Sequence, residues 1–278
     1  MMKVSGKEVA DKILESLQKE IAEQSLSPKL AIILAGDNPA SKIYVNRKIK
    51  AAQKVGVIAD LYQFQGHELE KCKETLQTLD NDPSVHGIII QYPVFETWDF
   101  ASLASLVRPE KDVDGFLPDS KFRGATALGI WEMLGAFAKL EGFSSTEEFL
   151  EGKKIVLLGK GRTAGGPTRD LLTEKQIPFN LIDSKTENPE ELIKNADVII
   201  SATGRKYIIT GDKIKEGSFV IGVGVGKEDV DGEQKIYGDI EEESVSQKAK
   251  LYCPTIGGIG PLTIACLLRN VVESASRS

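Results

Sequence analysis

The fold of the second half of the chain is decided by the stretch Lys154-Ile155-Val156-Leu157-Leu158-Gly159-Lys160-Gly161-Arg162-Thr163-Ala164-Gly165-Gly166-Pro167. Its short, continuous apolar run is typical of a strand that is covered on both faces. The glycines that follow let the backbone turn tightly and approach a phosphate at the N-terminus of a helix. The third glycine comes one residue later than in the G-x-G-x-x-G pattern. Alone, such a turn is a weak sign of a phosphate site, and the alternative is a tight connection that binds no ligand.

Downstream of this stretch, strands and helices alternate. The pattern predicts strands over 154–158, 179–182, 197–201 and 219–223, and helices near 166–175 and 189–195. The strand over 179–182 ends at Asp183 and Ser184, about 20 residues after the glycines, where contacts to an adenosine ribose belong. The second half is therefore predicted to be a Rossmann-like cofactor domain over residues 140–255.

Upstream, the same alternation occurs with different residues. Leu30-Ala31-Ile32-Ile33-Leu34 is a second continuous apolar run, and strands over 58–64 and 87–90 alternate with helices over 40–54 and 69–79. This order predicts a parallel sheet with right-handed crossovers. We expect an α/β chain with two lobes around a cleft: an N-terminal parallel α/β domain over 1–120, with a terminal helix over 261–275 packing back on it, and the Rossmann-like domain.

Composition excludes several function classes. The chain has 278 residues, 27% charged, with a net charge of −6, which argues against a broad electrostatic grip on nucleic acid or on an anionic membrane. Its three cysteines have no metal-ligand spacing and only two histidines accompany them, so no metal site is expected. The N-terminus lacks the apolar core of a signal peptide, and no apolar run approaches about 20 residues. We expect a cytoplasmic protein.

Four polar residues of the first half are candidates for chemistry. Tyr44 and Lys48 lie four apart on one predicted helix and share a face, although on spacing alone a solvated surface pair is the favoured interpretation. Gln91 comes at the C-terminal end of a predicted strand, where parallel sheets bind ligands, or simply faces solvent. Asp114 lies in an Asp-Val-Asp-Gly turn in which Asp112 or Asp114 could serve as the turn-forming residue.

A glycine cluster precedes the terminal helix. Ile256-Gly257-Gly258-Ile259-Gly260-Pro261-Leu262-Thr263 holds three glycines in four positions. They imply that the backbone lies close to a ligand or to a packed strand. Pro261 suits the first turn of a helix.

Together, these segments resemble the methylenetetrahydrofolate dehydrogenase/cyclohydrolase family along essentially the whole chain and in the family's order. Ser41 to Lys48 is similar to its S-x-x-Y-x-x-x-K segment, His86 to Pro93 to H-G-I-x-x-Q-x-P, and Lys111 to Phe116 to K-D-V-D-G-F. Gly257 to Thr263 resembles G-G-V-G-P-M-T. Several motifs in the correct order are far more specific than any one of them.

The resemblance implies roles for particular residues. Lys48 would be the catalytic base of a hydrolysis, with Gln91 holding its ammonium, while Tyr44 would stack on a pterin and Asp114 would bind the amino-pyrimidine edge. Folate would contact these four residues and Gly257. The nucleotide site would be lined by Thr126, Gly159, Lys160, Gly161, Arg162, Ala164, Gly165, Asp183, Ser184, Thr203, Val223, Gly260 and Thr263. Family members are usually homodimers, so a homodimer is expected here.

The sequence departs from the family mainly on the cofactor side. The usual G-R-S opening is Gly159-Lys160-Gly161, the His before Ser184 is Asp183, and the strand usually ending I-D-V-G reads Ile221-Gly222-Val223-Gly224. Asp183 favours NAD, because a carboxylate there binds ribose hydroxyls and repels a 2′-phosphate. Lys160, Arg162 and Lys185 favour NADP, as does Ser184, where the family has a phosphate-contacting serine. We favour NADP, with NAD as the alternative.

The implied function is oxidation of 5,10-methylenetetrahydrofolate to the 5,10-methenyl form with NAD(P)⁺, followed by hydrolysis to 10-formyltetrahydrofolate. One alternative is a dehydrogenase that releases the methenyl product. Another is a folate- or nucleotide-binding module without catalysis, which would have no need of Lys48.

Overall fold

The computed structural model describes residues 2–230 and 233–277 of the chain. The chain forms two compact units. The small-sheet unit comprises Asp11–Ala125 and Ile264–Ser278, and the large-sheet unit comprises Met1–Ala10 and Thr126–Thr263. Helices α1 (Gly6–Glu23) and α10 (Ile259–Ser276) each begin in the large-sheet unit and contribute their remaining residues to the small-sheet unit.

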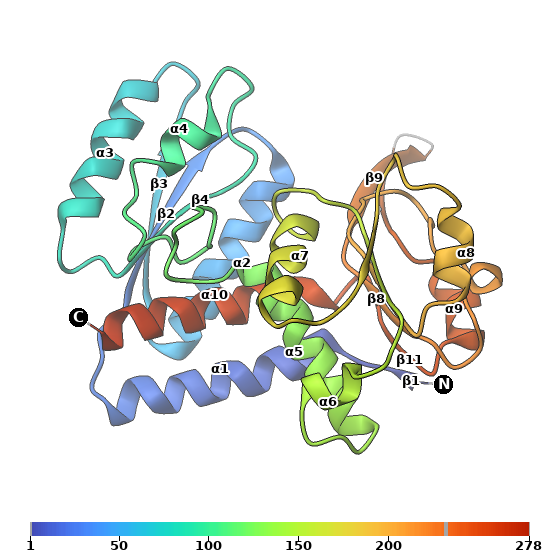
Figure 1. Ribbon diagram of the computed structural model, residues 1–278. Coiled ribbons are helices and arrows are strands. Elements are labelled where there is room, and N and C mark those ends of the chain that lie inside the picture. The colour runs from blue at the N-terminus through green and yellow to red at the C-terminus, as the bar shows by residue number, and fades with distance from the viewer. Residues whose placement is uncertain (1, 231–232, 278) are drawn as a thin grey trace. The chain divides into compact units, whose positions relative to one another are not determined.

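Three parallel strands form the small sheet (Figure 1). They are β2 (Lys29–Ala35), β3 (Ile58–Phe64) and β4 (Gly87–Ile90), in the order β3-β2-β4. The central strand β2 is exposed by at most 2% from Leu30 to Ala35, as its continuous apolar run predicts for a strand covered on both faces.

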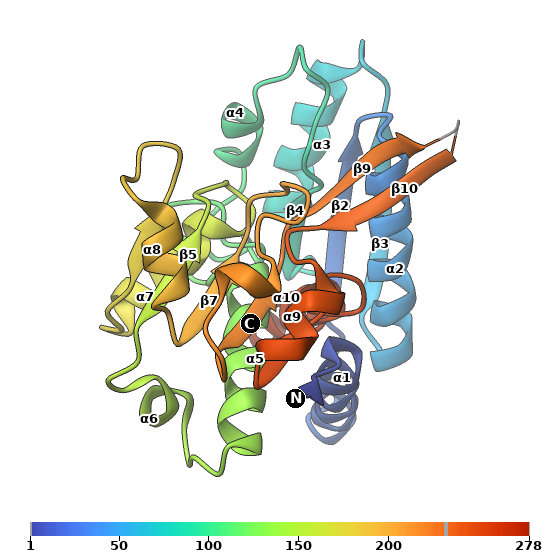
Figure 2. The ribbon, with the colours of Figure 1, turned by 90° about the vertical axis from the view of Figure 1, so that its right-hand side faces the viewer.

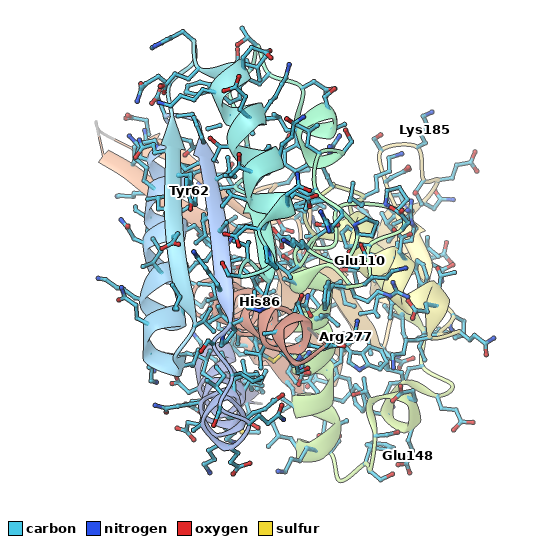
Figure 3. The ribbon with its side chains drawn as sticks, turned by 90° about the vertical axis from the view of Figure 1, so that its left-hand side faces the viewer. Tyr62, His86, Glu110, Glu148, Lys185 and Arg277 are labelled. Atoms are coloured by element: carbon cyan, nitrogen blue, oxygen red, sulfur yellow. The ribbon has the colours of Figure 1, made fainter. Side chains whose placement is uncertain are left out.

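Helices cover this small sheet. Helix α2 (Pro39–Val55) follows β2, α3 (Leu69–Asn81) follows β3, and the short α4 (Phe100–Ala104) follows β4. Apolar residues of α3 and α4, such as Leu76 and Leu103, share one buried cluster with Ile88 and Ile90 of β4. His86, directly before β4, lies beside α10 (Figure 3), and its carbonyl oxygen accepts a 2.6 Å hydrogen bond from Ser274 Oγ.

Six parallel strands form the large sheet, in the order β1-β11-β8-β7-β5-β6. Their bounds are β1 Met2–Lys3, β5 Ile155–Leu158, β6 Asn180–Ile182, β7 Val198–Ser201, β8 Phe219–Gly222 and β11 Leu251–Cys253. The helices of this part of the chain are α5 Ala125–Leu140, α6 Thr146–Leu150, α7 Gly165–Glu174, α8 Pro189–Lys194 and α9 Glu242–Lys248, with a 3-10 turn at Gly211–Lys213. A two-stranded antiparallel hairpin, β9 (Val225–Val230) and β10 (Glu233–Gly238), projects from this unit (Figure 2).

The predicted α/β class is confirmed, with a parallel sheet in each unit and a Rossmann-like order around β5. The predicted strands and helices occur within a few residues of their expected bounds. The sequence pattern did not predict β1, β11, the β9–β10 hairpin or the short helices α4, α6 and α9. Two- and three-residue strands and helices of a turn or two carry too few residues to display a period.

Candidate active site

Helix α2 presents two of the candidate residues on one face. The helix starts at an N-cap, where Asn38 Oδ1 accepts a 2.9 Å hydrogen bond from Ala40 N, and Pro39 occupies its first turn. It ends at Gly56, whose left-handed φ of 91° suits a glycine. Between these ends, Lys48 is only 5% exposed and Tyr44 is partly buried. The surface-pair interpretation of Tyr44 and Lys48 is therefore wrong.

Lys48 of α2 contacts Gln91, which directly follows β4. Its Nζ donates a 3.0 Å hydrogen bond to Gln91 Oε1, and Gln91 Nε2 donates a 2.8 Å bond to the carbonyl of Tyr92. The backbone N–H of Gln91 donates to Ile33 O at 2.9 Å, which ties the residue to β2. Because the amide nitrogen is already committed to a carbonyl, the amide oxygen is the atom left to face the ammonium.

Burial shifts the proton affinities of this cluster. It lowers the pKa of Lys48, and the nearby Asp114 carboxylate opposes part of that shift. Burial likewise raises the pKa of Asp114, which Lys48 opposes, and burial is also the main cause of the raised pKa of Tyr44. The neutral amine of Lys48 is consequently more accessible than in an exposed lysine, which is what proton transfer near neutral pH requires.

The loop that carries Asp114 is fixed from three directions. Asp112 Oδ2 accepts a 2.7 Å hydrogen bond from Leu117 N, so Asp112 is the turn-forming carboxylate of the pair. Asn270 of α10 donates to Val113 O at 2.9 Å. Gly115 has φ +68°, and a Cβ there would lie 2.6 Å from Gly124 N, so the turn requires glycine.

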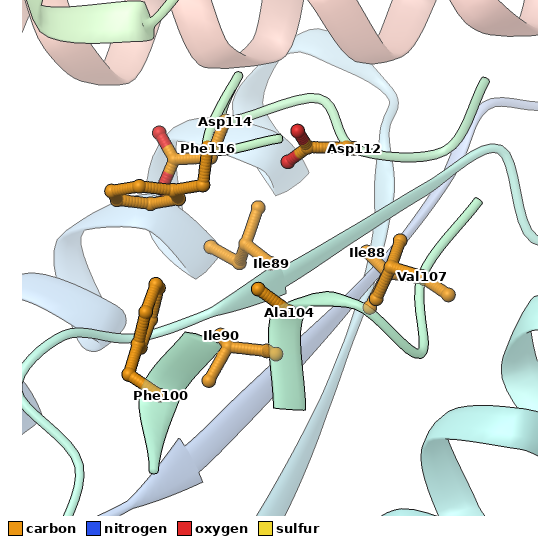
Figure 4. Close-up of a pocket in the computed structure, with 9 residues that line it drawn as sticks. All are labelled: Ile88, Ile89, Ile90, Phe100, Ala104, Val107, Asp112, Asp114 and Phe116. Carbon is orange, nitrogen blue, oxygen red and sulfur yellow. The ribbon is translucent and has the colours of Figure 1, made fainter. Parts of the chain in front are cut away.

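The Asp114 carboxylate is therefore available to bind a group outside its own loop. In the described part of the chain, its carboxylate accepts no hydrogen bond. It borders a cavity of about 10 Å³ that is also lined by Asp112 and Phe116 (Figure 4), which is room for about one water molecule. The sequence left open which of Asp112 and Asp114 forms the turn, and the hydrogen bond from Leu117 N assigns that role to Asp112.

In the large-sheet unit, the glycine stretch forms the tight connection from β5 to α7. A Cβ at Gly159, whose φ is +93°, would lie 2.5 Å from Ala202 O, and one at Gly165 would lie 2.2 Å from Gly159 O. A Cβ at Gly161 would meet nothing within 4 Å. No side chain caps α7, whose N-cap is Ala164. Uncapped N–H groups beside a glycine loop fit a phosphate, so the residues present can hold a dinucleotide.

At the end of β6, Asp183 pairs with Lys160 of the glycine loop. Lys160 Nζ lies 2.8 Å from Asp183 Oδ2, and Asp183 Oδ1 accepts a 2.9 Å bond from the backbone N of Lys185. Chiefly because of the Lys160 hydrogen bond, the pKa of Asp183 falls to about 2. Lys160, one of the three cations that favour NADP, thus forms an ion pair with Asp183. The exposed Lys185, on the loop beyond β6 (Figure 3), contributes only its N–H to the carboxylate, and Ser184 beside it is exposed.

The remaining candidates also lie in the large-sheet unit. Thr203 lies two residues after β7, Val223 follows β8 directly, and Arg162 is exposed on the glycine loop. Thr263 Oγ1 donates to Ile259 O at 3.1 Å and lies 3.4 Å from Thr126 Oγ1.

The second glycine cluster is needed for packing. A Cβ at Gly258 would lie 1.9 Å from Pro254 O, and one at Gly6 would lie 1.8 Å from Gly258 O. Gly257 has a left-handed φ of +77° with open space around it, and Gly260 lies in the first turn of α10. Tyr44, Lys48, Gln91 and Asp114 are thus gathered in one unit, while Gly257, predicted to contact folate, stands with the cofactor candidates in the other.

Sequence reasoning missed Asp239, which is fully buried behind the ends of β7 and β8. Its Oδ2 accepts hydrogen bonds from Ser201 Oγ at 2.8 Å and from Thr203 N at 2.7 Å. Only its place one residue after β10, in a Gly-Asp pair, could have drawn attention to it.

Two features are absent from the residues that the structure describes. No helix is both long enough and apolar enough to cross a membrane. Over 2–230 and 233–277, His, Cys, Asp and Glu side chains form no group of three or more that could hold a metal ion.

Known proteins resemble this chain over its full length. Residues 4–114 match the model of the tetrahydrofolate dehydrogenase/cyclohydrolase catalytic domain, and residues 124–278 match that of the NAD(P)-binding domain. The bifunctional protein FolD of Caldanaerobacter subterraneus subsp. tengcongensis is 35% identical over 273 residues, which cover 98% of this chain and 96% of that protein.

Two solved structures of methylenetetrahydrofolate dehydrogenase/cyclohydrolases are also similar to this chain. The bifunctional methylenetetrahydrofolate dehydrogenase/cyclohydrolase FolD of Campylobacter jejuni has a TM-score of 0.88 and 32% identity, covering 100% of this chain and 99% of its own. The Trypanosoma brucei enzyme, solved with NADP and an inhibitor, has a TM-score of 0.90 and 26% identity, covering 99% of this chain and 97% of its own.

Proposed function

The chain belongs to the tetrahydrofolate dehydrogenase/cyclohydrolase family, and we propose that its two units divide the chemistry of a bifunctional folate enzyme between them. The enzyme oxidises 5,10-methylenetetrahydrofolate to 5,10-methenyltetrahydrofolate with NAD(P)⁺ and hydrolyses the product to 10-formyltetrahydrofolate. The observation that carries the second activity is the buried Lys48, whose ammonium is held 3.0 Å from Gln91 Oε1.

The dehydrogenase step places few chemical demands on side chains. A dinucleotide held by the glycine loop between β5 and α7 would supply the hydride acceptor for the one-carbon bridge. The cation that is left on the folate is stabilised by the two nitrogens that flank it, so positioning matters more than an acid or a base. In our proposal Tyr44 stacks on the pterin, and Asp114, which accepts no hydrogen bond within the described chain, takes the donor edge of the amino-pyrimidine.

The hydrolysis requires a proton carrier. Water adds to the methenyl carbon, the bond to one flanking nitrogen breaks, and one proton is released overall. Lys48 is suited to move that proton, because burial lowers the pKa of its amine. Gln91 keeps Nζ in place while its own amide is fixed by the carbonyl of Tyr92.

The division into domains follows the same proposal. The folate-binding catalytic domain, expected over residues 1–120 with the terminal helix over 261–275, is in this proposal the small-sheet unit, although Met1–Ala10 belong to the large-sheet unit. The NAD(P)-binding domain is proposed over residues 140–255. A homodimer remains a proposal that rests on the family resemblance, and a cytoplasmic location also remains a proposal.

For the cofactor we propose NADP over NAD. The support is the ion pair between Lys160 and Asp183, because a carboxylate whose charge is balanced by a lysine repels a 2′-phosphate less. The exposed Ser184 and Arg162 lie on the two segments that carry this pair. The NADP in the Trypanosoma brucei structure is consistent with this preference.

One assay tests the function. Purified protein is mixed with methylenetetrahydrofolate and either NADP⁺ or NAD⁺, and the methenyl absorbance is followed as it forms and then decays. Formation faster with NADP⁺, followed by enzyme-dependent decay, is expected. Formation without enzyme-dependent decay would leave a monofunctional dehydrogenase, and no formation with either nucleotide would leave a binding module.

A further inference from the structure

The topology of the large sheet separates the two halves of a bound dinucleotide. In the order β8-β7-β5-β6, the chain runs from β5 to β6 on one side and then crosses back to β7 on the other. Dinucleotides bind at such a reversal, outside the carboxyl ends of the strands. Since Asp183 at the end of β6 marks the adenosine side, the ends of β7 and β8 belong to the nicotinamide side.

Asp239 ties these two strand ends together. Its side chain accepts hydrogen bonds from Ser201 Oγ and Thr203 N, at the end of β7. Its backbone N donates to Gly224 O at 3.1 Å, just beyond β8, and its carbonyl accepts from Ile209 N at 3.0 Å. One residue thereby fixes the turns that shape the predicted nicotinamide side.

The carboxylate has no charged partner in the described part of the chain. Both donors to Oδ2 are neutral, Oδ1 is buried without a hydrogen-bond partner, and the side chain forms no ion pair with a described residue. Burying a carboxylate without a cation is costly, so the position is an unusual place for an acid.

Gly224 packs directly against this carboxylate. A Cβ on Gly224 would lie 2.4 Å from Asp239 Oδ1 and 2.3 Å from Gly204 N. Gly224 and Val223 are themselves partly exposed at that edge. The charge of a buried carboxylate is screened less than that of one in water, so its field acts on a ligand bound at that edge.

We propose that Asp239 is a positioning residue that favours the oxidised cofactor. The oxidised nicotinamide ring carries a positive charge and the reduced ring carries none, so a nearby buried carboxylate attracts only the oxidised form. The inference rests on the proposed NAD(P) binding. The Asp239 carboxylate makes the site bind NAD(P)⁺ more tightly than NAD(P)H, a preference that the shape of the site alone would not provide.

The test compares the affinities of the two redox forms. Asp239→Asn has the same shape, and its amide oxygen can still accept from Ser201 and Thr203, but its charge is gone. Dissociation constants for NADP⁺ and NADPH are measured by calorimetry on the unmutated and variant proteins. NADP⁺ is expected to weaken by about 3- to 10-fold relative to NADPH. Asp183→Asn, on the adenosine side, is the matched control and should leave the ratio of the two affinities unchanged.

Each outcome has a meaning. Equal weakening of both redox forms, or an unchanged ratio, would overturn the role of Asp239 and leave a purely structural residue. If Asp239→Asn fails to fold, Asp239→Ser is measured instead. The unmutated protein provides a second test of the proposal: NADPH binding more than about tenfold tighter than NADP⁺ would contradict the bias. If the unmutated protein bound neither nucleotide, the proposed function itself would fail.

Discussion

Lys48 Nζ donates a 3.0 Å hydrogen bond to Gln91 Oε1 across 43 residues of sequence, and this contact joins a helix face to a strand end. The ammonium loses its water on burial and keeps one amide oxygen in exchange. That arrangement holds the nitrogen in place without a full negative charge in direct contact, so its pKa stays lowered.

Lys48→Met is expected to abolish the cyclohydrolase activity while folate still binds and some dehydrogenase activity remains. Removal of a general acid or base typically lowers a rate by about 10²–10⁴. Decay of the methenyl absorbance measures the loss. Lys50→Met, an exposed lysine on the same helix, is the control and should hydrolyse normally. Unchanged hydrolysis in Lys48→Met would rule out the role.

Substitutions of Gln91 should move the pH profile of the hydrolysis in opposite directions. In Gln91→Glu a carboxylate stabilises the ammonium, so the pKa of Lys48 rises and the rising limb shifts to higher pH by about one unit. In Gln91→Leu the ammonium loses its acceptor and the limb shifts to lower pH. The profile of kcat is measured after subtraction of the uncatalysed rate. Shifts of the same sign in both variants would contradict the assignment of the limb to Lys48.

Asp114→Ala should weaken folate far more than nucleotide. A charge-assisted hydrogen bond contributes about 1.5–3 kcal/mol, which corresponds to an affinity lower by roughly 10- to 150-fold. Calorimetry with a stable folate analogue and with NADP⁺ measures both. The control is Asp119→Ala, an exposed acid of the same loop. Parallel loss of both ligands would indicate a disrupted loop instead of a lost contact.

The Lys160–Asp183 pair gives a double-mutant test of nucleotide choice. Lys160→Met should weaken NADP⁺ more than NAD⁺, because it removes a cation and uncovers the Asp183 carboxylate. Asp183→Asn should improve NADP⁺, and the double variant should recover part of the loss. Lys185→Met keeps the backbone N–H that Asp183 uses and should change little. The ratio of kcat/KM for the two nucleotides is the measurement, and faster turnover of NAD⁺ by the unmutated enzyme would reverse the preference.

Much of the fold was predictable because its signals are local. The apolar run from Leu30 to Leu34 predicted a strand buried on both faces, and the sequence predicted a helix over 40–54 that carries Tyr44 and Lys48. In the structure this helix is capped by Asn38 and Gly56. The β9–β10 hairpin was not predicted. The apolar residues Ile236 and Val225 are each 52% exposed, so hydrophobicity along these strands does not mark a covered face.

For the site, too, part was predictable from local sequence and part was not. The motifs named Tyr44, Lys48, Gln91 and Asp114, but spacing alone favoured a solvated surface pair for the first two, and burial showed otherwise. Asp239 was missed, because its importance comes from Ser201 and Thr203, which lie 38 and 36 residues earlier.

By itself, the sequence determined the alternation of strands and helices, the turns that require glycine, and the identity of the residues that carry the family's chemistry. These follow from backbone sterics and from periodicity within a few residues. Only the tertiary structure decided that Lys160 and not Lys185 balances Asp183, that Asp112 forms the turn and Asp114 is left for a ligand, and that Lys48 is buried. Burial, charge pairing and proton affinity depend on which distant segments the fold brings within a few ångströms, and that is a property of packing, which no local stretch of chain contains.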